Sequence, residues 1–467
     1  MDLHTLRPEL LAARDARAAT IQRLVAGLPA GQCLVCASLN SPGPKKNPPG
    51  AEALLLRARQ GLRGQLMAEG RDALGPWMGI VVWREASRWR GGSGQVWREA
   101  RWRGGSGQVW REASASRPKG IKQWCVEIEE ATPAGRLLDL DVFTRDGRQV
   151  DRASLGLPPR RCLVCNEPAV DCMRARRHDS DDLENAVEGL LRRDACERLA
   201  EALVRGARTE LELTPKPGLV DRRDNGSHPD LSFELMSRSI ELLPQYFEDL
   251  LGIALRGTRG LPAPLDLPAC IAAGRRAEAR MVDAIGSNAH RGYIFLAGLV
   301  LLARASGATD RPALQGTVAN LAARILSLPS REDAETHGRD LRLRLGIGGI
   351  HAEALAGLPA VFDCGLPALE HGLATQPSAE AAHHLLMARL MTVVEDTTAL
   401  HRAGQAGLER LRRDGRHMVE LIESGADYLP FLAALNDEYR AARLTMGGVA
   451  DCMALTIAIQ ESVATGQ

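Results

Sequence analysis

The chain has 467 residues, 45% of them hydrophobic, so it carries enough apolar side chains for about two to four domains with buried cores. Its 59 Lys and Arg residues nearly cancel its 58 Asp and Glu residues, which excludes a protein that binds nucleic acid through a strongly basic surface. No apolar run approaches the roughly 20 residues that cross a bilayer, and residues 1–4 lack the features of a signal peptide. We therefore expect a cytoplasmic protein that binds neither nucleic acid nor membrane.

Aromatic residues divide the chain into two parts. All seven tryptophans lie between Trp77 and Trp124, whereas all four tyrosines and five of the six phenylalanines follow residue 230. This contrast indicates two separately derived domains, and we expect them to comprise residues 1–193 and 194–467.

The N-terminal part predicts a mixed α/β domain. The apolar run 33–39 ends at a turn over residues 40–44, which is typical of a strand, and we expect its two cysteines in the core. Apolar residues alternate with other residues over 124–129 and over 138–142, so each segment is predicted to be a half-buried strand. A helix is predicted to begin near Ser180, where the hydroxyl caps the first turn and two acids favour the positive end of the helix dipole.

A thirteen-residue string, RWRGGSGQVWREA, occurs twice in tandem over residues 88–113. Two such copies are far shorter than a solenoid. Arg and Trp side chains can stack on nucleic-acid bases, but the Gly-Gly-Ser-Gly stretch interrupts any continuous face. We interpret the repeat as a duplicated surface loop and assign it no function.

The segment GRLLDLDV carries the first candidate catalytic residues. On a strand, residues two apart share a face, so Asp139 and Asp141 project together. Neighbouring carboxylates repel each other unless a cation neutralises them, and Mg²⁺ shared between carboxylates and substrate phosphates has this effect. Lys46, in the stiff turn PGPKK, offers a compact positive charge for phosphate. An edge strand with two solvated acids and a solvated lysine loop accounts for the same residues without a function.

Four potential zinc ligands follow, namely Cys162, Cys165, Cys172 and His178. Three cysteines and one histidine form a complete ligand set for tetrahedral Zn²⁺. The preceding run Pro-Pro-Arg-Arg is not typical of regular secondary structure, so a metal ion could organise this segment. Reduced structural thiols explain the same spacing equally well.

The C-terminal part has apolar residues at three- and four-residue spacing between Gly and Pro clusters, which predicts an almost entirely helical domain. Four glycine-rich or charged islands separate these helices, over residues 213–228, 286–292, 346–353 and 444–451, and a fifth, residues 395–402, is expected to lie on a long helix. Glycines before helices supply backbone N–H groups for phosphate, cations bind phosphate, and acids bind Mg²⁺ or stabilise a cationic transition state. Each island alone also fits a helix cap, but five together favour a polyphosphate site.

Both parts resemble known enzyme families. PGPKK, GRLLDLDV and LPPRRCLVC resemble segments of the citrate lyase apo-acyl-carrier-protein phosphoribosyl-dephospho-CoA transferases, as do Cys172 and His178 after them. LTPKPGLVDRR, GSNAHRG, GGIHAEA, EDT and GGVAD resemble segments of the triphosphoribosyl-dephospho-CoA synthases. The order of the two parts matches fused, bifunctional forms of this pair. The resemblance implies a nucleotidyltransferase-like mixed sheet in residues 1–193 and an all-α helical bundle in residues 194–467.

The resemblance also implies two reactions. The synthase part would move the triphosphorylated ribose of ATP onto the 2′-hydroxyl of 3′-dephospho-CoA and expel adenine. The transferase part would attach that product to a serine of the citrate lyase acyl carrier protein, its γ subunit, and release diphosphate.

Candidate site residues follow from these reactions. Carboxylates would stabilise positive charge on the ribose, Lys and Arg side chains would clamp the triphosphate, and acids on the strand would hold Mg²⁺ on the diphosphate while Lys46 and Arg136 offset its charge. The implied catalytic residues are Asp139, Asp141, Arg136, Lys46, Asp221, Glu353, Asp396 and Asp451. The implied nucleotide-binding residues are Lys216, Gly218, Arg222, Arg223, Asn288, His290, Arg291, Glu395, Arg402, Gly447 and Gly448.

Departures from the family patterns leave two other hypotheses open. The synthase pattern has Arg-Gly-Glu where His351-Ala-Glu353 stands, which replaces a permanent cation by histidine, and the tandem repeat interrupts the transferase part. A second hypothesis is a synthase that serves another carrier protein, of the malonate decarboxylase type, with an impaired N-terminal part. A third is a zinc-stabilised adaptor that binds a carrier protein without chemistry.

Overall fold

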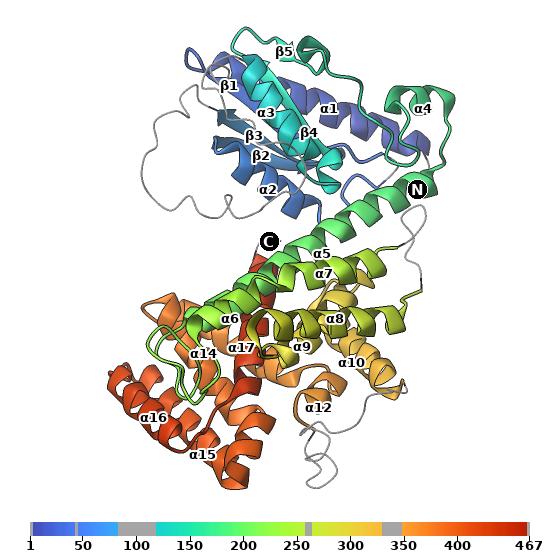
Figure 1. Cartoon of the computed structure of the whole chain (residues 1–467). Coiled ribbons are helices and arrows are strands. Elements are labelled where there is room, and N and C mark those ends of the chain that lie inside the picture. The colour runs from blue at the N-terminus through green and yellow to red at the C-terminus, as the bar shows by residue number, and fades with distance from the viewer. Residues whose placement is uncertain (1–2, 43–44, 83–117, 257–263, 329–347, 465–467) are drawn as a thin grey trace. The chain divides into compact units, whose positions relative to one another are not determined.

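The computed structural model describes residues 3–42, 45–82, 118–256, 264–328 and 348–464 (Figure 1). The chain divides between Asp194 and Ala195 into two compact units, called unit 1 and unit 2 below. The long helix α5 (Ser180–Glu212) belongs to unit 1 up to Asp194 and to unit 2 beyond it, and it begins where the sequence predicts. The tandem repeat of residues 88–113 lies outside the described residues.

Unit 1 contains a five-stranded sheet in the order β2-β3-β1-β4-β5. Its elements are α1 (Leu3–Ala26), β1 (Cys33–Leu39), α2 (Ala51–Leu62), β2 (Gln65–Asp72), β3 (Gly75–Val82), α3 (Pro118–Ala131), β4 (Leu138–Thr144), β5 (Gln149–Val150) and α4 (Ala169–Ala175). Every strand pair that the structure describes is antiparallel. The α/β class is therefore confirmed, whereas the strand pairing is antiparallel and not mixed.

Different helices cover the two faces of this sheet (Figure 1). Val35 of β1 and Leu140 of β4 belong to the larger core, which also contains apolar residues of α2 and α3. Leu34 of β1 and Val81 of β3 belong to a smaller cluster with residues of α1. Because neighbouring residues of a strand point to opposite faces, this division follows from the pleat.

The predicted strands at residues 33–39 and 138–142 are confirmed, but the one at residues 124–129 is wrong. That segment lies in helix α3. Its buried residues include Ile121, Cys125 and Glu129, which are four residues apart and so share one helix face. The alternation seen at residues 124–129 is too short to outweigh this helical spacing.

Side chains of α3 and of the segment before Cys162 form hydrogen bonds with backbone groups along the edge of β4. The backbone N–H of Leu140 donates to the Glu129 carboxylate at 2.9 Å, and Lys122 Nζ donates to the carbonyl of Leu140 at 2.7 Å. Arg160 donates to the carbonyl of Leu138 at 2.6 Å. Buried backbone groups need such partners, so charged residues are buried here in place of a further strand.

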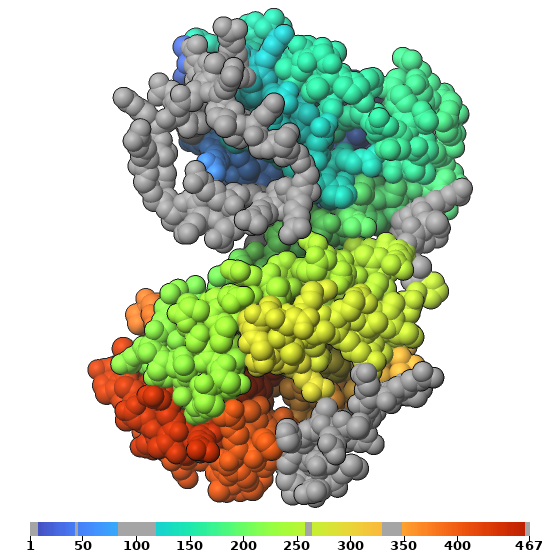
Figure 2. Space-filling view, viewed as in Figure 1, coloured from blue at the N-terminus to red at the C-terminus, as the bar shows by residue number. Residues whose placement is uncertain are grey.

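In the residues that the structure describes, the regular elements of unit 2 are helices, which confirms the predicted all-α bundle. Beyond α5, its helices are α6 (Phe233–Ile240), α7 (Leu243–Ala254), α8 (Leu267–Ile285), α9 (Arg291–Ala305), α10 (Arg311–Ser327), α12 (Gly349–Leu355), a π-helical turn (Ala360–Gly365), α13 (Leu366–Thr375), α14 (Ala379–Val393), α15 (Thr397–Glu423), α16 (Leu429–Ala441) and α17 (Gly447–Ala464). The green-to-yellow helices α6 to α8 and the orange-to-red helices at the C-terminal end form adjoining parts of its surface (Figure 2).

Helix α17 lies in the core of unit 2 and packs closely on α5. A Cβ atom at Gly206 would overlap the carbonyl oxygen of Ala454, so glycine permits the two helices to approach. Across the described part of the chain, no single helix combines the length and apolar character needed to cross a membrane. One bent pair, Gly349–Leu355 with Ala360–Thr375, passes that test by length and composition alone.

Candidate functional site

In unit 1, Asp139 and Asp141 share one face of β4. The residues between and beside them, Leu138, Leu140 and Val142, are buried on the opposite face. Asp141 accepts a hydrogen bond from Gln149 Nε2 at 2.8 Å. Burial, and then the neighbouring charge of Asp139, raise the pKa of Asp141 to about 6. Burial and a like charge both disfavour the ionised carboxylate, and a bound cation would offset both effects.

Arg160 is the cation that the structure places against this pair. It donates to Asp139 at 3.0 Å and to the buried Glu129 at 2.8 Å. The predicted cations lie elsewhere: Lys46 Nζ donates to the carbonyl of Ser41 at 2.7 Å, and Arg136 donates to the carbonyl of Cys162 at 2.7 Å. Sequence reasoning missed Arg160, although the run Pro-Pro-Arg-Arg contains it.

The four predicted zinc ligands come together in unit 1. One sulfur or nitrogen atom from each of Cys162, Cys165, Cys172 and His178 lies within 4.8 Å of the others. Cys165 Sγ lies 3.3 Å from Cys172 Sγ and 3.2 Å from His178 Nε2. The hydrogen bond from the backbone of Glu167, and then the Cys172 and His178 side chains, lower the pKa of Cys165 to about 6. Three sulfurs and one imidazole nitrogen at this spacing suit a tetrahedral metal ion.

Local turns build this cysteine–histidine cluster. The N–H of Cys162 donates to the carbonyl of Glu167 at 2.6 Å, which closes a turn around Cys165. Cys172 lies on the short helix α4, and His178 lies just before α5. Cys33 and Cys36, by contrast, are buried in β1, as predicted.

In unit 2, the loop after α5 is organised by the buried Asp221. Its carboxylate accepts the backbone N–H of Lys216 at 2.8 Å and of Arg223 at 2.7 Å. The side chain of Lys216, 1% exposed, donates to Glu210 of α5 at 2.5 Å. Gly218 has φ of 70° and donates its N–H to the Asn436 side chain at 2.9 Å. Asp221 thus fixes the loop, while Lys216 pairs with a carboxylate that the sequence did not single out.

A small cavity of 80 Å³ lies beside the start of α17. Its ionisable lining residues are Glu210, His228, His290 and Asp451, and its walls include Tyr293. These residues come from α5, the loop after it, the start of α9, and α17. The structure therefore brings together His290 and Asp451, which the sequence predicted, with Glu210 and His228. We call this space the smaller cavity.

Asp451 of α17 lies partly buried at the N-terminus of α9. The backbone N–H of Tyr293 bonds to it, and a Cβ atom on Gly292 would overlap its carboxylate, so glycine makes room for the acid. Burial, and then the charges of Asp396 and Glu210, raise the pKa of Asp451 well above its usual range. This helix N-terminus, a predicted phosphate site, is therefore already in contact with a carboxyl group of the protein.

Asp396 accepts hydrogen bonds from the N-termini of two helices. Its carboxylate accepts the N–H groups of Thr398 and Ala399 at 2.9 Å each, at the start of α15, and the N–H of Val449 at 3.0 Å, in the first turn of α17. The prediction that Asp396 lies on a long helix is wrong, because Asp396 precedes α15 as its N-cap. Gly447 begins α17, and Gly448 packs against Asp396.

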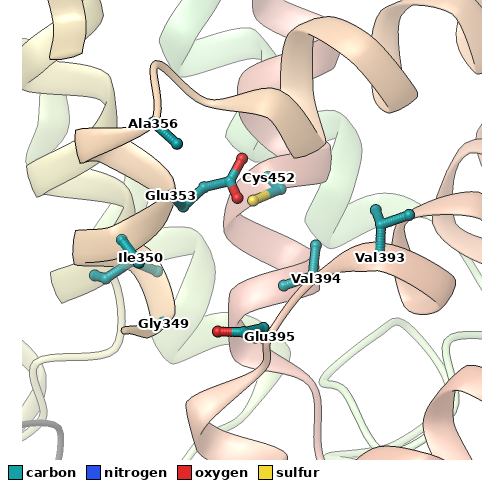
Figure 3. Close-up of a pocket in the computed structure, with 9 residues that line it drawn as sticks. Gly349, Ile350, Glu353, Ala356, Val393, Val394, Glu395 and Cys452 are labelled. Carbon is teal, nitrogen blue, oxygen red and sulfur yellow. The ribbon is translucent and has the colours of Figure 1, made fainter. Parts of the chain in front are cut away.

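A larger cavity of 290 Å³ lies on the other side of the start of α17 (Figure 3). Glu353 of α12 and Cys452 of α17 point toward each other across it, and Glu395 lines it from the segment between α14 and α15. The Glu353 carboxylate accepts the N–H of Ala360 at 2.6 Å, and burial raises the pKa of Glu353.

The remaining predicted binding residues line neither cavity. Arg222 and Arg223 are exposed, and Arg222 pairs with Glu212 at 3.0 Å. Asn288 donates to Glu278 at 2.8 Å, and Arg291 lies 3.7 Å from the same carboxylate. The remaining cation of this set, Arg402, donates to the carbonyl of Ser227 at 2.7 Å.

Comparisons with known proteins agree with this division of the chain. Residues 89–194 match the CitX family model, apo-citrate lyase phosphoribosyl-dephospho-CoA transferase, and residues 196–466 match the CitG model, ATP:dephospho-CoA triphosphoribosyl transferase. Protein CitXG of Leuconostoc mesenteroides is 30% identical over 378 residues, which cover 73% of this chain and 77% of that protein.

Two further relatives show the same pattern. Protein CitXG of Haemophilus influenzae is 30% identical over 362 residues, covering 72% of this chain and 76% of that protein. A probable 2-(5''-triphosphoribosyl)-3'-dephosphocoenzyme-A synthase of Pseudomonas paraeruginosa is 35% identical over 285 residues, covering 58% of this chain and 93% of that protein. The chain therefore belongs to the ATP:dephospho-CoA triphosphoribosyl transferase family and, with the apo-citrate lyase transferase part that precedes it, to the fused CitXG transferases of citrate lyase prosthetic group synthesis.

Proposed function

We propose that unit 2 transfers the triphosphoribosyl group of ATP to the 2′-hydroxyl of 3′-dephospho-CoA at the smaller cavity and releases adenine. The observation that carries this proposal is a pair of carboxyl groups with different surroundings in one cavity. Asp451 is partly buried and its raised pKa favours the protonated form, whereas Glu210 is held in an ion pair with Lys216. Enzymes that break glycosidic bonds use such a division between an acid and a carboxylate.

The two carboxyl groups suit the two charges that develop in this reaction. As the bond between ribose C1′ and adenine N9 breaks, positive charge builds on the sugar and negative charge on the departing base. Protonated Asp451 donates its proton to adenine. Glu210 stabilises the cationic ribose, and its bond to Lys216 holds Glu210 in place.

The sizes of the two cavities support a further assignment within unit 2. Sites for small molecules typically measure roughly 300–1,000 Å³, so the smaller cavity of 80 Å³ takes only the reacting sugar. The larger cavity, of 290 Å³, has apolar walls from Ile350, Val393 and Val394. We assign one nucleotide base to it, with Glu353 accepting a hydrogen bond from the exocyclic amino group.

The triphosphate would bind exposed arginines that now make weak surface pairs. Arg222 and Arg291 are 57% and 59% exposed in their pairs with Glu212 and Glu278. Exposed pairs of this kind contribute only about 0–1 kcal/mol. A phosphate chain carries several negative charges, so it can replace these carboxylates without a large cost.

In unit 1, we propose that the product is attached to a serine of the citrate lyase acyl carrier protein, its γ subunit. Asp139 and Asp141 fit a Mg²⁺ ion, because they share one face of β4 and a cation would offset both the burial and the neighbouring Asp139 charge that raise the pKa of Asp141. When bound there, Mg²⁺ would offset the negative charge of the diphosphate leaving group. Arg160 would hold the same phosphates, and Lys46 would supply a second charge from the loop after β1.

We further propose that the cysteine–histidine cluster binds a structural Zn²⁺ ion. Four ligands fill a tetrahedral coordination sphere and leave no position for a substrate, which is typical of structural zinc sites. Arg160 precedes Cys162 by two residues and contacts Asp139. Zinc would therefore keep this arginine beside the acid pair.

Incubating the full-length protein with ATP and 3′-dephospho-CoA tests the proposal for unit 2. Mass spectrometry should detect free adenine and a triphosphoribosyl-dephospho-CoA product. Adding the apo-form of the citrate lyase carrier should then shift the carrier mass by one prosthetic group, in proportion to added Mg²⁺. The absence of adenine would contradict the assignment of unit 2.

A second carrier distinguishes the remaining hypotheses. Adenine release with loading of only a malonate decarboxylase carrier would contradict the assignment of unit 1 and retain that of unit 2. Carrier binding with neither adenine release nor a mass shift would favour an adaptor. Metal analysis of the purified protein should give one zinc ion per chain, and its absence would contradict the zinc assignment.

A further inference from the structure

His290 lies in the smaller cavity with one ring nitrogen bonded and the other available. Its Nδ1 atom lies 2.8 Å from the hydroxyl of Ser239 on α6, and both side chains are buried. Among the residues that the structure describes, the hydrogen bond of His290 is the one through Nδ1, and the ring lines the cavity. Because Nδ1 is engaged by Ser239, Nε2 is the nitrogen that a molecule in the cavity can reach.

The hydrogen bonds of Ser239 determine which nitrogen carries the proton. The Ser239 hydroxyl also lies 2.7 Å from the backbone carbonyl of Met236. A carbonyl oxygen only accepts, and a hydroxyl has a single hydrogen, so Ser239 donates to Met236. Its lone pair is left to accept from Nδ1–H of His290. Nε2 therefore carries a free lone pair toward the cavity.

His384 shows what a purely structural histidine looks like in the same unit. It is also buried, and burial lowers its pKa to about 4, as in His290. However, His384 uses both nitrogens: Nδ1 lies 3.2 Å from the hydroxyl of Tyr428, and Nε2 lies 3.2 Å from the carbonyl of Pro215. The difference between the two histidines is the unused Nε2 atom in the cavity.

We propose that His290 is the general base that removes the proton from the attacking 2′-hydroxyl, and that Ser239 is a positioning residue that fixes the tautomer of His290. This inference rests on the proposed function of unit 2. Asp451 was assigned above as the acid that protonates the leaving adenine. His290 would be the base that acts on the attacking hydroxyl.

The complete step balances in protons and electron pairs. The 2′-oxygen of dephospho-CoA forms a bond to C1′ of the ribose, and its proton moves to Nε2 of His290. The bond between C1′ and N9 breaks, and adenine leaves with that electron pair and the proton of Asp451. Transfer of the proton from His290 to Asp451 restores both groups, since both line the same cavity.

Burial and a neighbouring charge keep the imidazole of His290 neutral, so that its Nε2 atom can accept a proton. Burial, and then the charge of Lys216, lower the pKa of His290 to about 4, so the imidazole is neutral at neutral pH. Glu210 and Asp451 line the cavity from α5 and α17. His228 lines it as well, but its Nε2 atom is engaged with Thr445 Oγ1 at 3.0 Å.

The decisive experiment measures adenine release by the full-length protein and its variants. His290→Asn keeps a donor for Ser239 but has no base, so kcat should fall about 100-fold or more, while ATP still binds. Substituted imidazoles should rescue His290→Ala at rates that rise with their basicity, which mere filling of the space would not produce. Ser239→Ala should lower kcat about tenfold, and it should have no further effect when combined with His290→Ala.

His384→Asn is the control for a structural histidine, and it should lower the melting temperature with little change in kcat. Adenine release by His290→Asn at the wild-type rate would overturn the proposal for His290 alone. Rescue of His228→Ala by imidazoles, and not of His290→Ala, would overturn it in favour of His228. A wild-type protein that releases no adenine would contradict the proposed function itself, and with it the role of His290.

Discussion

The two units both place carboxyl groups close together, but they accommodate them differently. On β4 of unit 1, Asp139 and Asp141 remain half-buried, and the repulsion between them is left partly unrelieved. At the start of α17 in unit 2, Asp396 is buried, Asp451 is partly buried, and both bind backbone N–H groups at the N-termini of helices. Neutral donors of the protein thus surround the second pair of acids.

This difference distinguishes acidic clusters that are stabilised by helix N-termini from those that need a cation. Helix N-termini carry unpaired N–H groups and a partial positive charge, so they stabilise a carboxyl group without a metal ion. A strand offers no such groups to side chains on its face. The pair on β4 therefore suits a cation, whereas the acids at the helix N-termini of unit 2 suit structure and proton transfer.

The largest effect is expected for Asp451→Asn. Asparagine keeps the shape of the side chain and its acceptor for Tyr293, but it cannot donate a proton to departing adenine. The kcat for adenine release should fall about 100-fold or more, as measured by chromatography of the base. Asp437→Asn, at an acid that is 81% exposed on α16, is the matched control. Undiminished adenine release by Asp451→Asn would remove it from the mechanism.

Asp141→Asn should affect only the other unit. Without the second carboxylate, the Mg²⁺ concentration that half-saturates carrier loading should rise at least about tenfold, measured by the mass of the carrier at increasing Mg²⁺. Adenine release should be unchanged. Asp146→Asn, in the exposed turn after β4, serves as the control. An unaltered Mg²⁺ dependence would show that the pair on β4 binds no metal.

The fold was predictable where a short pattern decides the structure. The strands at 33–39 and 138–142 are apolar runs or alternations next to turns, and the pleat alone accounts for their buried faces. Helix α3 was missed because its buried set includes Lys122 and Glu129, which sequence reasoning assigns to the surface. These two residues are buried because they bond the edge of β4, and that need exists only in the folded sheet.

The candidate site was predictable where its residues are close in the sequence. The cysteine–histidine cluster spans residues 162–178, and its spacing alone identified it. The smaller cavity draws residues from four distant segments, and nothing in the local sequence around Glu210 or Ser239 marks them. Arginines near glycines were expected to gather around phosphate, but they pair instead with nearby acids and carbonyls on the surface.

Cys172→Ser tests whether the cluster supports the acid pair. The variant should bind Zn²⁺ at least about tenfold more weakly, as measured by metal analysis after dialysis against a chelator. Arg160 would lose its anchor, so carrier loading should also fall while adenine release persists. Cys364→Ser, at a half-buried thiol of unit 2, is the control. Full metal content in Cys172→Ser would contradict the four-ligand site.

The smallest effect is expected for Asp396→Ala, which separates structure from catalysis in unit 2. Three backbone N–H groups of α15 and α17 would lose their acceptor, and the free energy of unfolding should fall by about 2 kcal/mol. Asp310→Ala is the matched control, because this N-cap of α10 accepts one N–H, from Ala313, and should cost about 1 kcal/mol.

Urea unfolding can follow the two units of these variants separately, because all seven tryptophans lie before residue 125 and all four tyrosines lie after residue 245. The tryptophan transition should stay in place, while the tyrosine transition moves to lower urea. If Asp396→Ala costs no more than Asp310→Ala, then the helix N-termini find other acceptors. Asp396 would in that case be free for a chemical role. The proposed difference between the acids of unit 2, which accept helix N–H groups, and those of unit 1, which bind a cation, would not hold for Asp396.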